Sequence, residues 1–593
     1  MNKKVLVTTA INLEKKNNDS LLYLGRWCLD KYDRKKSNNL NHTILPYHWD
    51  NREKLYNDYI YLDNFYEKIL KEISYSLNKI HNTDYSIRYW RILIGPWLGY
   101  FIHIIFDRWS NINQAKKNYE ISHAIIQSNK NDEVVPKNMS NFQELIRTDS
   151  WNHFIYSYIL INFTNIECKY LKKNQKIKKF KNQGSIKIKI KLKKKLKIFL
   201  NFFSNFFVND TDAFIINSYL SKKNEFLLNI KLKQIPKFYS EISKNFESKL
   251  DLYKRRWKLN GQSNNEFEIL LRELVPQQIP IYYIENYNNL IKFVLNLKWP
   301  KKPKAIFTSG SYISDDIFKF YAANKTEQGS PLVIGQHGGG TGTYNFSFNE
   351  EHQIKICDLY LSWGWENIQS NKVKPIGQLK DIKKIDIDYI NNDKILLVTI
   401  KIPEYSSRLV STPISSQWVS YYEDQCKFID YLSPKIRESL TVRLKLLDTI
   451  GLEPSYERWK NKFPSLDINN GSSNIKSLIV QSKIYVSTYN ATTFLESFSY
   501  NIPTVIFWDK SMWELRDSAK KYFDHLKMSK ILHDSPISAA QHINNIWNNI
   551  DDWWCSDIVK NSRKVFLNQY CKKSNDIASD VKSSLQKIIE ISN

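Results

Sequence analysis

The amino-acid sequence predicts an α/β protein with two Rossmann-like domains, and three stretches carry that prediction. Lys4–Thr9 (KVLVTT) is a short β-rich run that leads through a loop into a helical pattern at 21–30. Lys394–Ile400 (KILLVTI) predicts the first strand of a second such domain. Val480–Trp508 then predicts a strand, a polar turn, a helix and another strand, which is half of a doubly wound unit.

The polar turn in this last stretch predicts a site for an anion. Its residues Ser487, Thr488 and Asn490 follow the strand Lys483–Val486, and a helix opens at 491–493. The first backbone N–H groups of a helix have no partner within the helix and lie at the positive end of its dipole. A phosphate or carboxylate is stabilised at such a point.

Side chains of the predicted helix extend this site. Thr492 and Thr493 can hold phosphate oxygens through their hydroxyls. Glu496 lies one turn into the helix, where a carboxylate can accept hydrogen bonds from a ribose diol. Together they predict a binding site for a nucleoside monophosphate or diphosphate. The alternative is a capped helix in an ordinary βαβ unit, which the spacing alone favours equally.

Length and composition indicate a globular protein rather than a disordered or fibrous one. The 593 residues can bury two substantial cores, so two domains with insertions are the simplest fit. The six cysteines are far apart, which supports neither a zinc knuckle nor a disulfide framework. The start MNKKVLVTTAINL predicts a strand rather than a signal peptide. No window approaches about eighteen uninterrupted apolar residues, and we expect a cytoplasmic protein.

The formal net charge of +27 is unevenly distributed. Leu171–Leu200 holds thirteen lysines and no acidic residue, which leaves +14 for the rest of the chain. Lysines interleaved with Ile, Leu and Phe are attracted to an anionic membrane surface. We therefore expect the segment 171–206 to bind the inner face of the cytoplasmic membrane, with nucleic acid a poorer fit and a solvated insertion the alternative.

The segment Ser86–Trp109 is dense in aromatic residues and is interrupted by Gly95-Pro96. We expect that dipeptide to end one helix and begin another, giving a buried helical pair. Charges on such an apolar surface are costly unless they are paired. We therefore expect structural ion pairs for most of the charged residues here, which are Arg88, Arg91, Asp107 and Arg108.

A strand at Leu332–Ile334 runs directly into GQHGGG, where Gln336 and Gly338 flank a single imidazole, that of His337. Glycines let a backbone approach a ligand closely, and no Gly-Lys-Ser/Thr follows to complete a Walker A loop. We expect His337 to be the catalytic base. A satisfied structural histidine is the alternative.

Two acids of the N-terminal half are further catalytic candidates, as base or as nucleophile. Glu14 lies in the loop after the first strand, and Asp315 lies just beyond the strand-to-helix turn Ser309–Ser311. Ligands of open α/β sheets bind beyond the carboxyl ends of strands. For Glu14, an ordinary surface position is the alternative.

Three arginines are placed to meet an anionic substrate. Arg443 lies near the end of the strand Leu440–Leu444 and can make a bidentate contact to the donor phosphate or to a sugar carboxylate. A surface ion pair is the alternative. Arg408 follows the strand at 394–400, and Arg516 lies in Trp513–Leu526. We expect both to line the cleft between the domains.

The chain resembles a family of large bacterial transferases that build surface carbohydrate, O-antigen and capsule, with GT-B-like features. It is distantly similar to 3-deoxy-ulosonic acid (Kdo) transferases and to CDP-glycerol transferases. The stretches that carry the resemblance span nearly the whole chain and are Thr8–Lys16, Leu24–Cys28, Tyr89–Trp109, Gly335–Gly342, Ser487–Glu496 and Trp513–Leu526.

The resemblance implies two Rossmann-like domains that face each other across a cleft, with helical insertions in the first. We expect an N-terminal acceptor domain at 1–385, a donor-nucleotide domain at 386–557, and a terminal helix at 558–593 that packs back on the N-terminal domain. The resemblance also implies that Glu496 holds the donor ribose, that the Gln-His-Gly of residues 336–338 lies in the cleft, and that neither a metal nor a cofactor is required.

For function, the resemblance implies a glycosyltransferase that moves a sugar from a nucleotide donor onto a surface polysaccharide or lipid-linked acceptor. The donor that it implies is a CMP-linked 3-deoxy-ulosonic acid such as Kdo. The alternatives are a transferase that uses a CDP-polyol, a UDP-sugar or a GDP-sugar, and a non-catalytic scaffold for polysaccharide assembly that has kept the fold.

Overall fold

The computed structural model describes residues 3–10, 20–29, 42–126, 134–170, 209–247, 249–367, 370–380, 393–445 and 455–592. Glu14 and the basic segment 171–206 lie outside these ranges. The chain forms two compact units. The first comprises Met1–Ile334, Lys355–Asp358 and Val581–Asn593, and the second comprises Gly335–Ile354 and Leu359–Asp580. The domain boundaries expected at 385 and 557 stay predictions.

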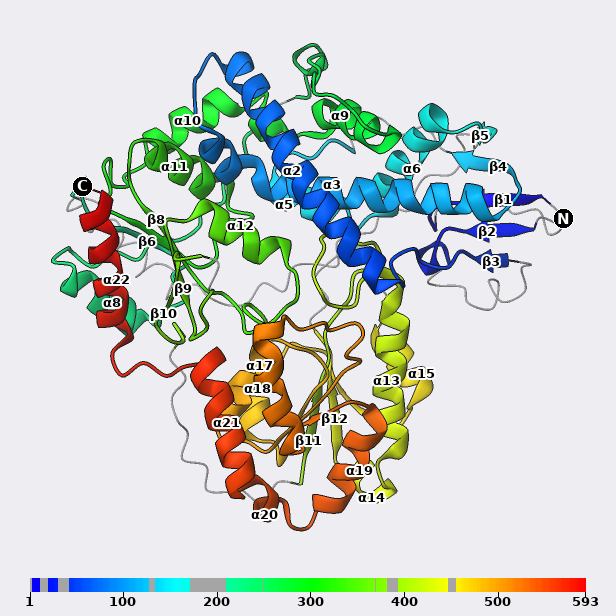
Figure 1. The fold of residues 1–593 in the computed structure, drawn as a ribbon, viewed down its shortest axis with the longest axis vertical. Coiled ribbons are helices and arrows are strands. Elements are labelled where there is room, and N and C mark those ends of the chain that lie inside the picture. The colour runs from blue at the N-terminus through cyan, green and yellow to red at the C-terminus, as the bar shows by residue number, and fades with distance from the viewer. Residues whose placement is uncertain are drawn as a thin grey trace. The chain divides into compact units, whose positions relative to one another are not determined.

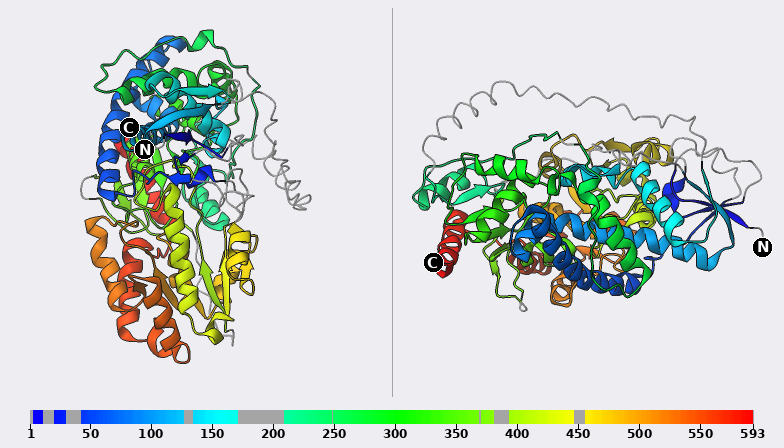
Figure 2. Two further views of the ribbon diagram at one scale, coloured as in Figure 1. Left: turned by 90° about the vertical axis from the view of Figure 1, so that its right-hand side faces the viewer. Right: turned by 90° about the horizontal axis from the view of Figure 1, so that it is seen from above.

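The first unit opens with a five-stranded parallel sheet. Its strands are β1 (Lys4–Val7), β2 (Leu21–Tyr23), β3 (His42–Ile44), β4 (Ile121–Ile126) and β5 (Cys168–Tyr170), in the spatial order β3-β2-β1-β4-β5 (Figure 1). Figure 2 shows the same strands in blue and cyan from two further sides. The apolar side chains of β1 are almost completely buried, as expected for a central parallel strand covered on both faces. Because β1 lies between β2 and β4, the sheet reverses its order there, as a Rossmann-like half does.

The first unit is also rich in helices. The first unit contains α2 (Arg52–His81), α3 (Ile87–Asn118), α5 (Met139–Leu145), α6 (Asp149–Phe163), α8 (Lys222–Lys231), α9 (Glu266–Gln278), α10 (Tyr287–Leu295) and α11 (Asp316–Glu327). Asn51 and Ser86 cap α2 and α3 by accepting hydrogen bonds from backbone N–H groups three residues on.

The helix break expected at Gly95-Pro96 is wrong. Helix α3 runs without interruption from Ile87 to Asn118, with Pro96 inside it. Its apolar side chains are buried on nearly every side, and it packs against α2, α6 and α11. That burial outweighs the hydrogen bond that the proline removes, which costs about 3 kcal/mol in an isolated helix.

A second parallel sheet consists of β6 (Phe214–Ile216), β7 (Ile306–Thr308), β8 (Leu332–Gly335), β9 (Leu359–Ser362) and β10 (Val373–Pro375). Its order is β10-β9-β8-β7-β6, so neighbours in sequence are neighbours in space. Strand β8 leads directly into the GQHGGG segment, as predicted.

The third sheet, in the second unit, has six parallel strands. They are β11 (Ile395–Val398), β12 (Leu440–Arg443), β13 (Asp467–Asn469), β14 (Ile484–Ser487), β15 (Thr504–Phe507) and β16 (Leu532–His533). Their order, β13-β12-β11-β14-β15-β16, is that of a dinucleotide-binding Rossmann sheet, with the switch point between β11 and β14. The predicted fold class, α/β with Rossmann-like parts of GT-B type, is confirmed at the level of these sheets.

Helices cover both faces of the third sheet (Figure 1). They are α13 (Trp418–Tyr431), α14 (Pro434–Arg437), α15 (Ser455–Lys462), α16 (Ile475–Val480), α17 (Thr492–Ser499), α18 (Asp517–Met528), α19 (Pro536–Ile546), α20 (Ile550–Trp554) and α21 (Asp557–Tyr570). Helices α13 and α19 pack together on one face, and α17, α18 and α21 pack on the other. Two further helices are α12 (Phe348–Ile356) and α22 (Ile577–Ser592). The segment 558–593, expected to be one terminal helix, therefore contains two, α21 and α22.

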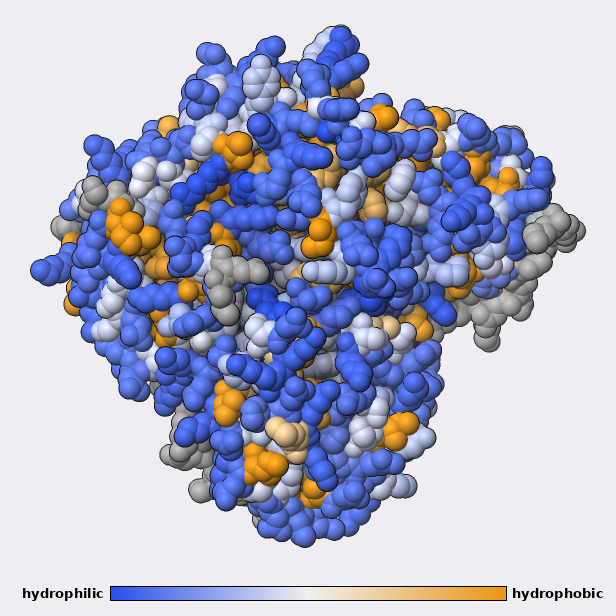
Figure 3. All heavy atoms as spheres, in the orientation of Figure 1, coloured by the Kyte–Doolittle hydropathy of each residue, from blue (hydrophilic) through white to orange (hydrophobic). Residues whose placement is uncertain are grey.

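The helices in the part of the chain that the structure describes can be compared with the requirements of a membrane span. None of these described helices combines the length and the apolar character that a membrane span requires. On the face drawn in Figure 3, apolar residues are scattered among hydrophilic ones. Peripheral association through 171–206 stays a prediction.

Candidate functional site

The turn between β14 and α17 is the centre of the candidate site. Strand β14 ends at Ser487, and the turn residues Thr488 and Asn490 are almost completely buried. Ala491 is the N-cap of α17, and no side chain caps the helix. The N–H groups of the first turn of α17 therefore donate no hydrogen bond to a capping side chain, which leaves this helix start suited to an anion.

The GQHGGG loop reaches the same helix start. The N–H of Gly339 donates to Oγ1 of Thr492 over 3.0 Å. The hydroxyl of Tyr344 donates to the carbonyl of Asn490 over 2.8 Å, and Nδ2 of Asn490 donates to Oγ1 of Thr343 over 2.8 Å. Two motifs that the sequence analysis singled out independently are thus joined within one unit.

Gly339 packs so closely against the start of α17 that a side chain would not fit there. A Cβ atom there would lie 2.5 Å from Cδ1 of Leu495 and 2.9 Å from Cα of Thr492. The neighbouring Gly338 has a φ of 122°, a conformation that side chains other than glycine rarely adopt. A loop with larger residues could not lie this close to the start of α17.

The hydroxyls expected to bind phosphate also order the turn itself. Oγ1 of Thr493 accepts a hydrogen bond from the hydroxyl of Tyr485 over 2.6 Å and lies 2.8 Å from that of Tyr489. The hydroxyl of Ser487 donates to the carbonyl of Tyr489 over 3.0 Å. These bonds fix the shape of the turn before any ligand arrives.

Thr488 ties the turn to the neighbouring strand and to helix α13. Its hydroxyl donates to the carbonyl of Val398 at the end of β11, over 3.0 Å. Its Oγ1 also lies 2.6 Å from the hydroxyl of Tyr421, which accepts from the N–H of Ile400. The polar turn therefore lies at the switch point of the third sheet, where open α/β sheets bind their ligands.

Glu496, the predicted ribose ligand, is buried one turn into α17 with 3% of its surface exposed. Its carboxylate forms an ion pair with Lys380, whose side chain is 43% exposed. A buried carboxylate needs such a partner. The sequence analysis missed Lys380, because the residue lies 116 positions away from Glu496 in an unremarkable segment.

His337 is exposed, next to the glycines that contact α17. Its surroundings, through desolvation and then through the charge of Lys380, lower the pKa of His337 below its usual 6.5. The imidazole is therefore neutral at pH 7, which is the form that a general base requires. Gln336, by contrast, is fully buried and accepts hydrogen bonds from Trp363 N–H and Trp365 Nε1–H, both over 2.8 Å.

Arg516 forms hydrogen bonds that hold the loop after the GQHGGG segment. Its Nε donates to the carbonyl of Tyr344 over 3.0 Å, and Nη2 contacts Oε1 of Glu350 over 2.5 Å. The other oxygen of Glu350 accepts from the N–H of Gly342 over 2.8 Å. Arg516 thus positions the glycine loop, and Arg408 lies exposed on the segment that follows β11.

Arg443, at the end of β12, is half-buried. Its Nη2 donates to the carbonyls of Gly471 and Ser473, each over 3.3 Å. Burial lowers the pKa of Arg443, although the side chain stays charged. The guanidinium therefore holds the loop between β13 and α16 in this structure.

Asp315, in the first unit, caps α11 by accepting the Phe318 N–H over 3.0 Å. The side chain is buried, and its Oδ2 has no hydrogen-bond partner among the described residues. Burial raises the pKa of Asp315 to about 7. Next to it, Asp316 pairs with the buried Lys319 and accepts the hydroxyl of Tyr283 over 2.5 Å.

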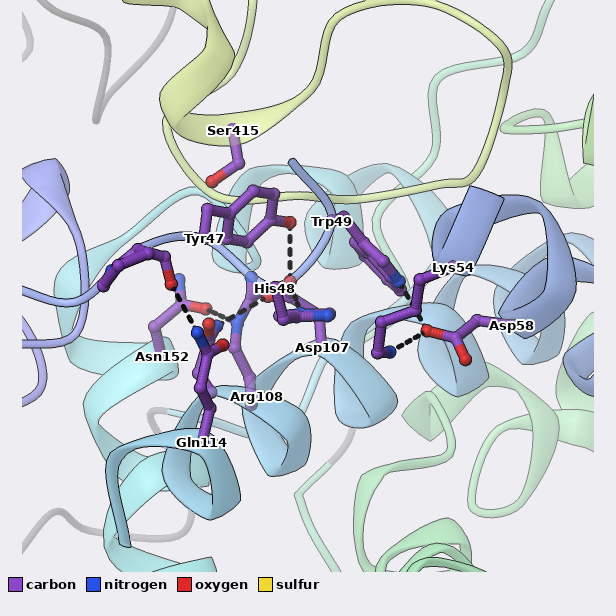
Figure 4. A network of polar contacts seen from close by, with 12 residues as sticks. Tyr47, His48, Trp49, Lys54, Asp58, Asp107, Arg108, Gln114, Asn152 and Ser415 are labelled. Carbon is purple, nitrogen blue, oxygen red and sulfur yellow. Dashed lines mark hydrogen bonds and ion pairs between the residues drawn. The ribbon is translucent and has the colours of Figure 1, made fainter. Parts of the chain in front are cut away.

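The charged residues of α3 form the structural network that the sequence analysis expected, with partners that it did not name. Figure 4 shows Tyr47 and His48 pointing toward Asp107. The Tyr47 hydroxyl donates to Oδ1 over 2.6 Å, His48 Nε2 lies 3.0 Å from the same atom, and Arg108 pairs with Oδ2. Burial would raise the pKa of Asp107, but Arg108 and these hydrogen bonds hold it at about 2.

Within the described ranges, no group of three or more His, Cys, Asp or Glu side chains gathers in a way that could hold a metal ion. Metal independence and the roles of the individual site residues stay predictions. Glu14 lies outside the described residues.

Comparison with known proteins gives one match along nearly the whole chain. A profile of the family described as LIC12162 family transferase matches residues 4–585. No functionally curated protein matches the chain.

Many solved structures are distantly similar to the chain, and three of them illustrate the range. A variant of S. aureus TarM in complex with fondaparinux, α-GlcNAc-glycerol and UDP has 11% identity and a TM-score of 0.32, over 50% of this chain and 58% of TarM. S. aureus MnaA with UDP has 11% identity and a TM-score of 0.36, over 65% of this chain and 98% of MnaA. A variant of the wall teichoic acid polymerase TagF soaked with CDPG has 9% identity and a TM-score of 0.30, over 67% of this chain and 92% of TagF.

Proposed function

We infer the function from the premise that this chain belongs to the LIC12162 family of transferases, and we propose that it is a glycosyltransferase. It transfers a sugar from a nucleotide donor to a surface polysaccharide or a lipid-linked acceptor. The observation that carries this proposal is the junction at α17, where an uncapped helix start, a buried carboxylate and a glycine loop meet at the switch point of a Rossmann sheet.

The donor nucleotide binds at this junction. Backbone N–H groups of the first turn of α17 hold a phosphate oxygen, and the hydroxyl of Thr492 lies at the same helix start. Glu496 accepts hydrogen bonds from the ribose diol, and Lys380 forms an ion pair with the same carboxylate. Ser487, Thr488, Asn490 and Thr493 support the donor by fixing the turn.

The reaction needs stabilisation of the leaving phosphate, because the bond to the sugar breaks as the anomeric centre becomes cationic. Fixed N–H donors at a helix start supply this without reorganisation. Arg443 and Arg408 are the arginines of this unit that we assign to the phosphate or to a sugar carboxylate. The proposed chemistry requires no metal.

The acceptor hydroxyl needs a base. His337 is the first candidate, since it is exposed, is neutral at pH 7, and lies beside the loop that contacts α17. Asp315 is the second, because burial raises its pKa to about 7 and thereby makes the carboxylate more basic. We keep Glu14 as the third.

The donor that we favour is a CMP-linked 3-deoxy-ulosonic acid such as Kdo, because the resemblance to Kdo transferases implies it and its carboxylate suits the arginines of this unit. A CDP-polyol and UDP- or GDP-sugars are the alternatives. Nucleotide release from each donor distinguishes them. The proposal expects turnover with one class of donor, and no turnover with any donor would favour a non-catalytic scaffold.

The acceptor is held close to a membrane by the basic segment 171–206, which we propose to bind anionic lipid. The test is sedimentation with vesicles that contain anionic lipid. A variant with a Gly/Ser linker of equal length in place of 171–206 should lose most of its binding. Equal binding by the variant and by the wild type would contradict the assignment.

A further inference from the structure

A loop of the first unit, residues 249–258, carries two exposed apolar side chains at its tip. They lie at the start of the 3-10 turn η3 (Tyr253–Arg255), and Leu252 and Tyr253 expose 56% and 75% of their surfaces. A single exposed apolar residue is ordinary on a protein surface. The significance of this pair therefore depends on the charges around it and on how firmly the loop is held.

The residues around this apolar pair are mainly basic. From 244 to 258 the sequence contains six cations and two acids. Lys254, Arg256 and Lys258 are exposed. The guanidinium carbon of Arg256 lies 4.3 Å from the centre of the Tyr253 ring, so a cation lies directly against the exposed aromatic side chain. Of the two acids, Asp251 is used within the turn, where its Oδ1 accepts the N–H of Tyr253 over 3.0 Å.

Buried contacts fix the turn to the body of the unit. The side chains of Arg255 and Glu285 are 3% and 4% exposed, and they pair through Nε and Oε1 over 2.6 Å and through Nη2 and Oε2 over 2.8 Å. Oε1 of Glu285 also accepts the N–H of Asp251 over 3.2 Å, and Nη1 of Arg255 donates to the carbonyl of Ile279 over 2.7 Å. Both sides of the apolar pair are thus anchored, and the pair is presented to solvent on an ordered turn.

We propose that this loop binds the surface of a bilayer that contains anionic lipid. Leu252 and Tyr253 enter the interfacial layer, and the three exposed cations contact the lipid headgroups. Apolar side chains next to cations suit such a surface, and tyrosine is enriched at the boundary between membrane and water. Two apolar side chains are too few for a specific protein interface, which takes about 20 residues on each side. The loop is a contact beyond the basic segment 171–206 and does not depend on it.

The test is lipid titration of the full chain with sedimented vesicles of phosphatidylcholine, with and without phosphatidylglycerol. The double variant Leu252→Ser, Tyr253→Ser should lower the partition coefficient on the anionic vesicles by about tenfold or more. The double variant Lys254→Gln, Arg256→Gln should lower it by a similar factor of about ten, because each cation close to an anionic surface adds attraction. Thermal melts confirm that each variant is folded.

Matched controls come from exposed positions of the second unit. Ile558 is 56% exposed, as Leu252 is, and it follows an acid, Asp557. Ile558→Ser should bind vesicles within about twofold of the wild type, since a lone apolar residue beside an acid adds little attraction. The double variant Lys435→Gln, Lys510→Gln removes two exposed charges without touching the loop, and it should also stay within about twofold.

Unchanged partition coefficients in both loop variants would overturn the inference, and so would equal losses in the loop variants and their controls. Weaker binding of labelled single-stranded DNA with unchanged vesicle binding would also overturn it, because the loop would then contact nucleic acid. The variant with a linker in place of 171–206 separates the two membrane contacts. If only that variant loses vesicle binding, the inference fails and the role of the segment stands, whereas losses in the loop variants alone assign the contact to the loop.

Discussion

The amide nitrogen of Gly339 lies 3.0 Å from the hydroxyl oxygen of Thr492, a residue 153 positions further along the chain. This hydrogen bond joins the glycine loop after β8 to the start of α17. Because His337 is two residues before Gly339 and Glu496 is four residues after Thr492, the bond sets the relation between the proposed base and the proposed ribose ligand.

A side chain at position 339 should disturb this junction. In Gly339→Ala the new Cβ would meet Leu495 and the backbone of Thr492, so the loop has to move away from α17. We expect a loss of about 1–3 kcal/mol in unfolding free energy and weaker CMP binding. Gly329→Ala, in the other unit, is the control for backbone strain alone: nothing lies within 4 Å of a Cβ there, but the φ of 94° disfavours alanine, so stability should fall without a change in CMP binding. Equal effects of the two substitutions on CMP binding would contradict the proposed role of the loop.

The ion pair between Lys380 and Glu496 should appear as a coupling energy. Lys380→Met leaves a buried carboxylate without its cation, and we expect it to cost about 1–2 kcal/mol, reduced by the exposure of the lysine. In the background of Glu496→Gln the same substitution should cost much less. Urea denaturation of the wild type, Lys380→Met, Glu496→Gln and the double variant measures this coupling energy. Strictly additive effects would show that the pair does not contribute to stability.

The rate of transfer should depend on pH through His337. Only the neutral imidazole can accept a proton, and desolvation and Lys380 lower its pKa. Activity should therefore level off toward alkaline pH and fall on acidification, with a midpoint below 6.5. His337→Gln should remove that acid limb along with most of the rate. A profile with the same acid limb in His337→Gln would exclude His337 as the base.

Stability should also fall on acidification because of buried histidines. Burial lowers the pKa of His103 to about 3 and that of His153 to about 4. Between those values and about 6.5 the unfolded chain binds more protons than the folded chain, so unfolding free energy decreases as the pH falls. Protonation of each histidine in the unfolded chain should lower the unfolding free energy by about 2 kcal/mol at pH 5, relative to neutral pH.

The variant His103→Leu tests this sign. It removes one titrating group, so the slope of unfolding free energy against pH between 5 and 6.5 should decrease by about one proton. Urea denaturation at several pH values measures the slope. A slope that matches the wild type would contradict the burial argument for His103.

The sequence predicted the turn at α17 well because its signals are local. The strand β14 and helix α17 begin within a residue of their expected places, since apolar runs and an intervening polar turn determine both. Pro96 misled the analysis, because burial of α3 on all sides outweighs a local helix breaker. Tertiary packing decided that position.

Contacts across long stretches of sequence could not be predicted. The partners Lys380 and Glu496 are 116 residues apart, and Tyr421 and Thr488 are 67 apart. No motif surrounds Lys380 or Tyr421, so no local pattern indicated them.

If the turn before α17 and Glu496 hold the nucleotide of the donor, as we propose, CMP affinity measured by calorimetry should depend on Glu496. In Glu496→Ala we expect the dissociation constant to rise by about tenfold or more, because a charged hydrogen bond to the ribose is lost. Glu438→Ala, an exposed glutamate of the same unit, should bind CMP as the wild type does. If Glu496→Ala folds and binds CMP with unchanged affinity, the donor nucleotide does not bind at this turn.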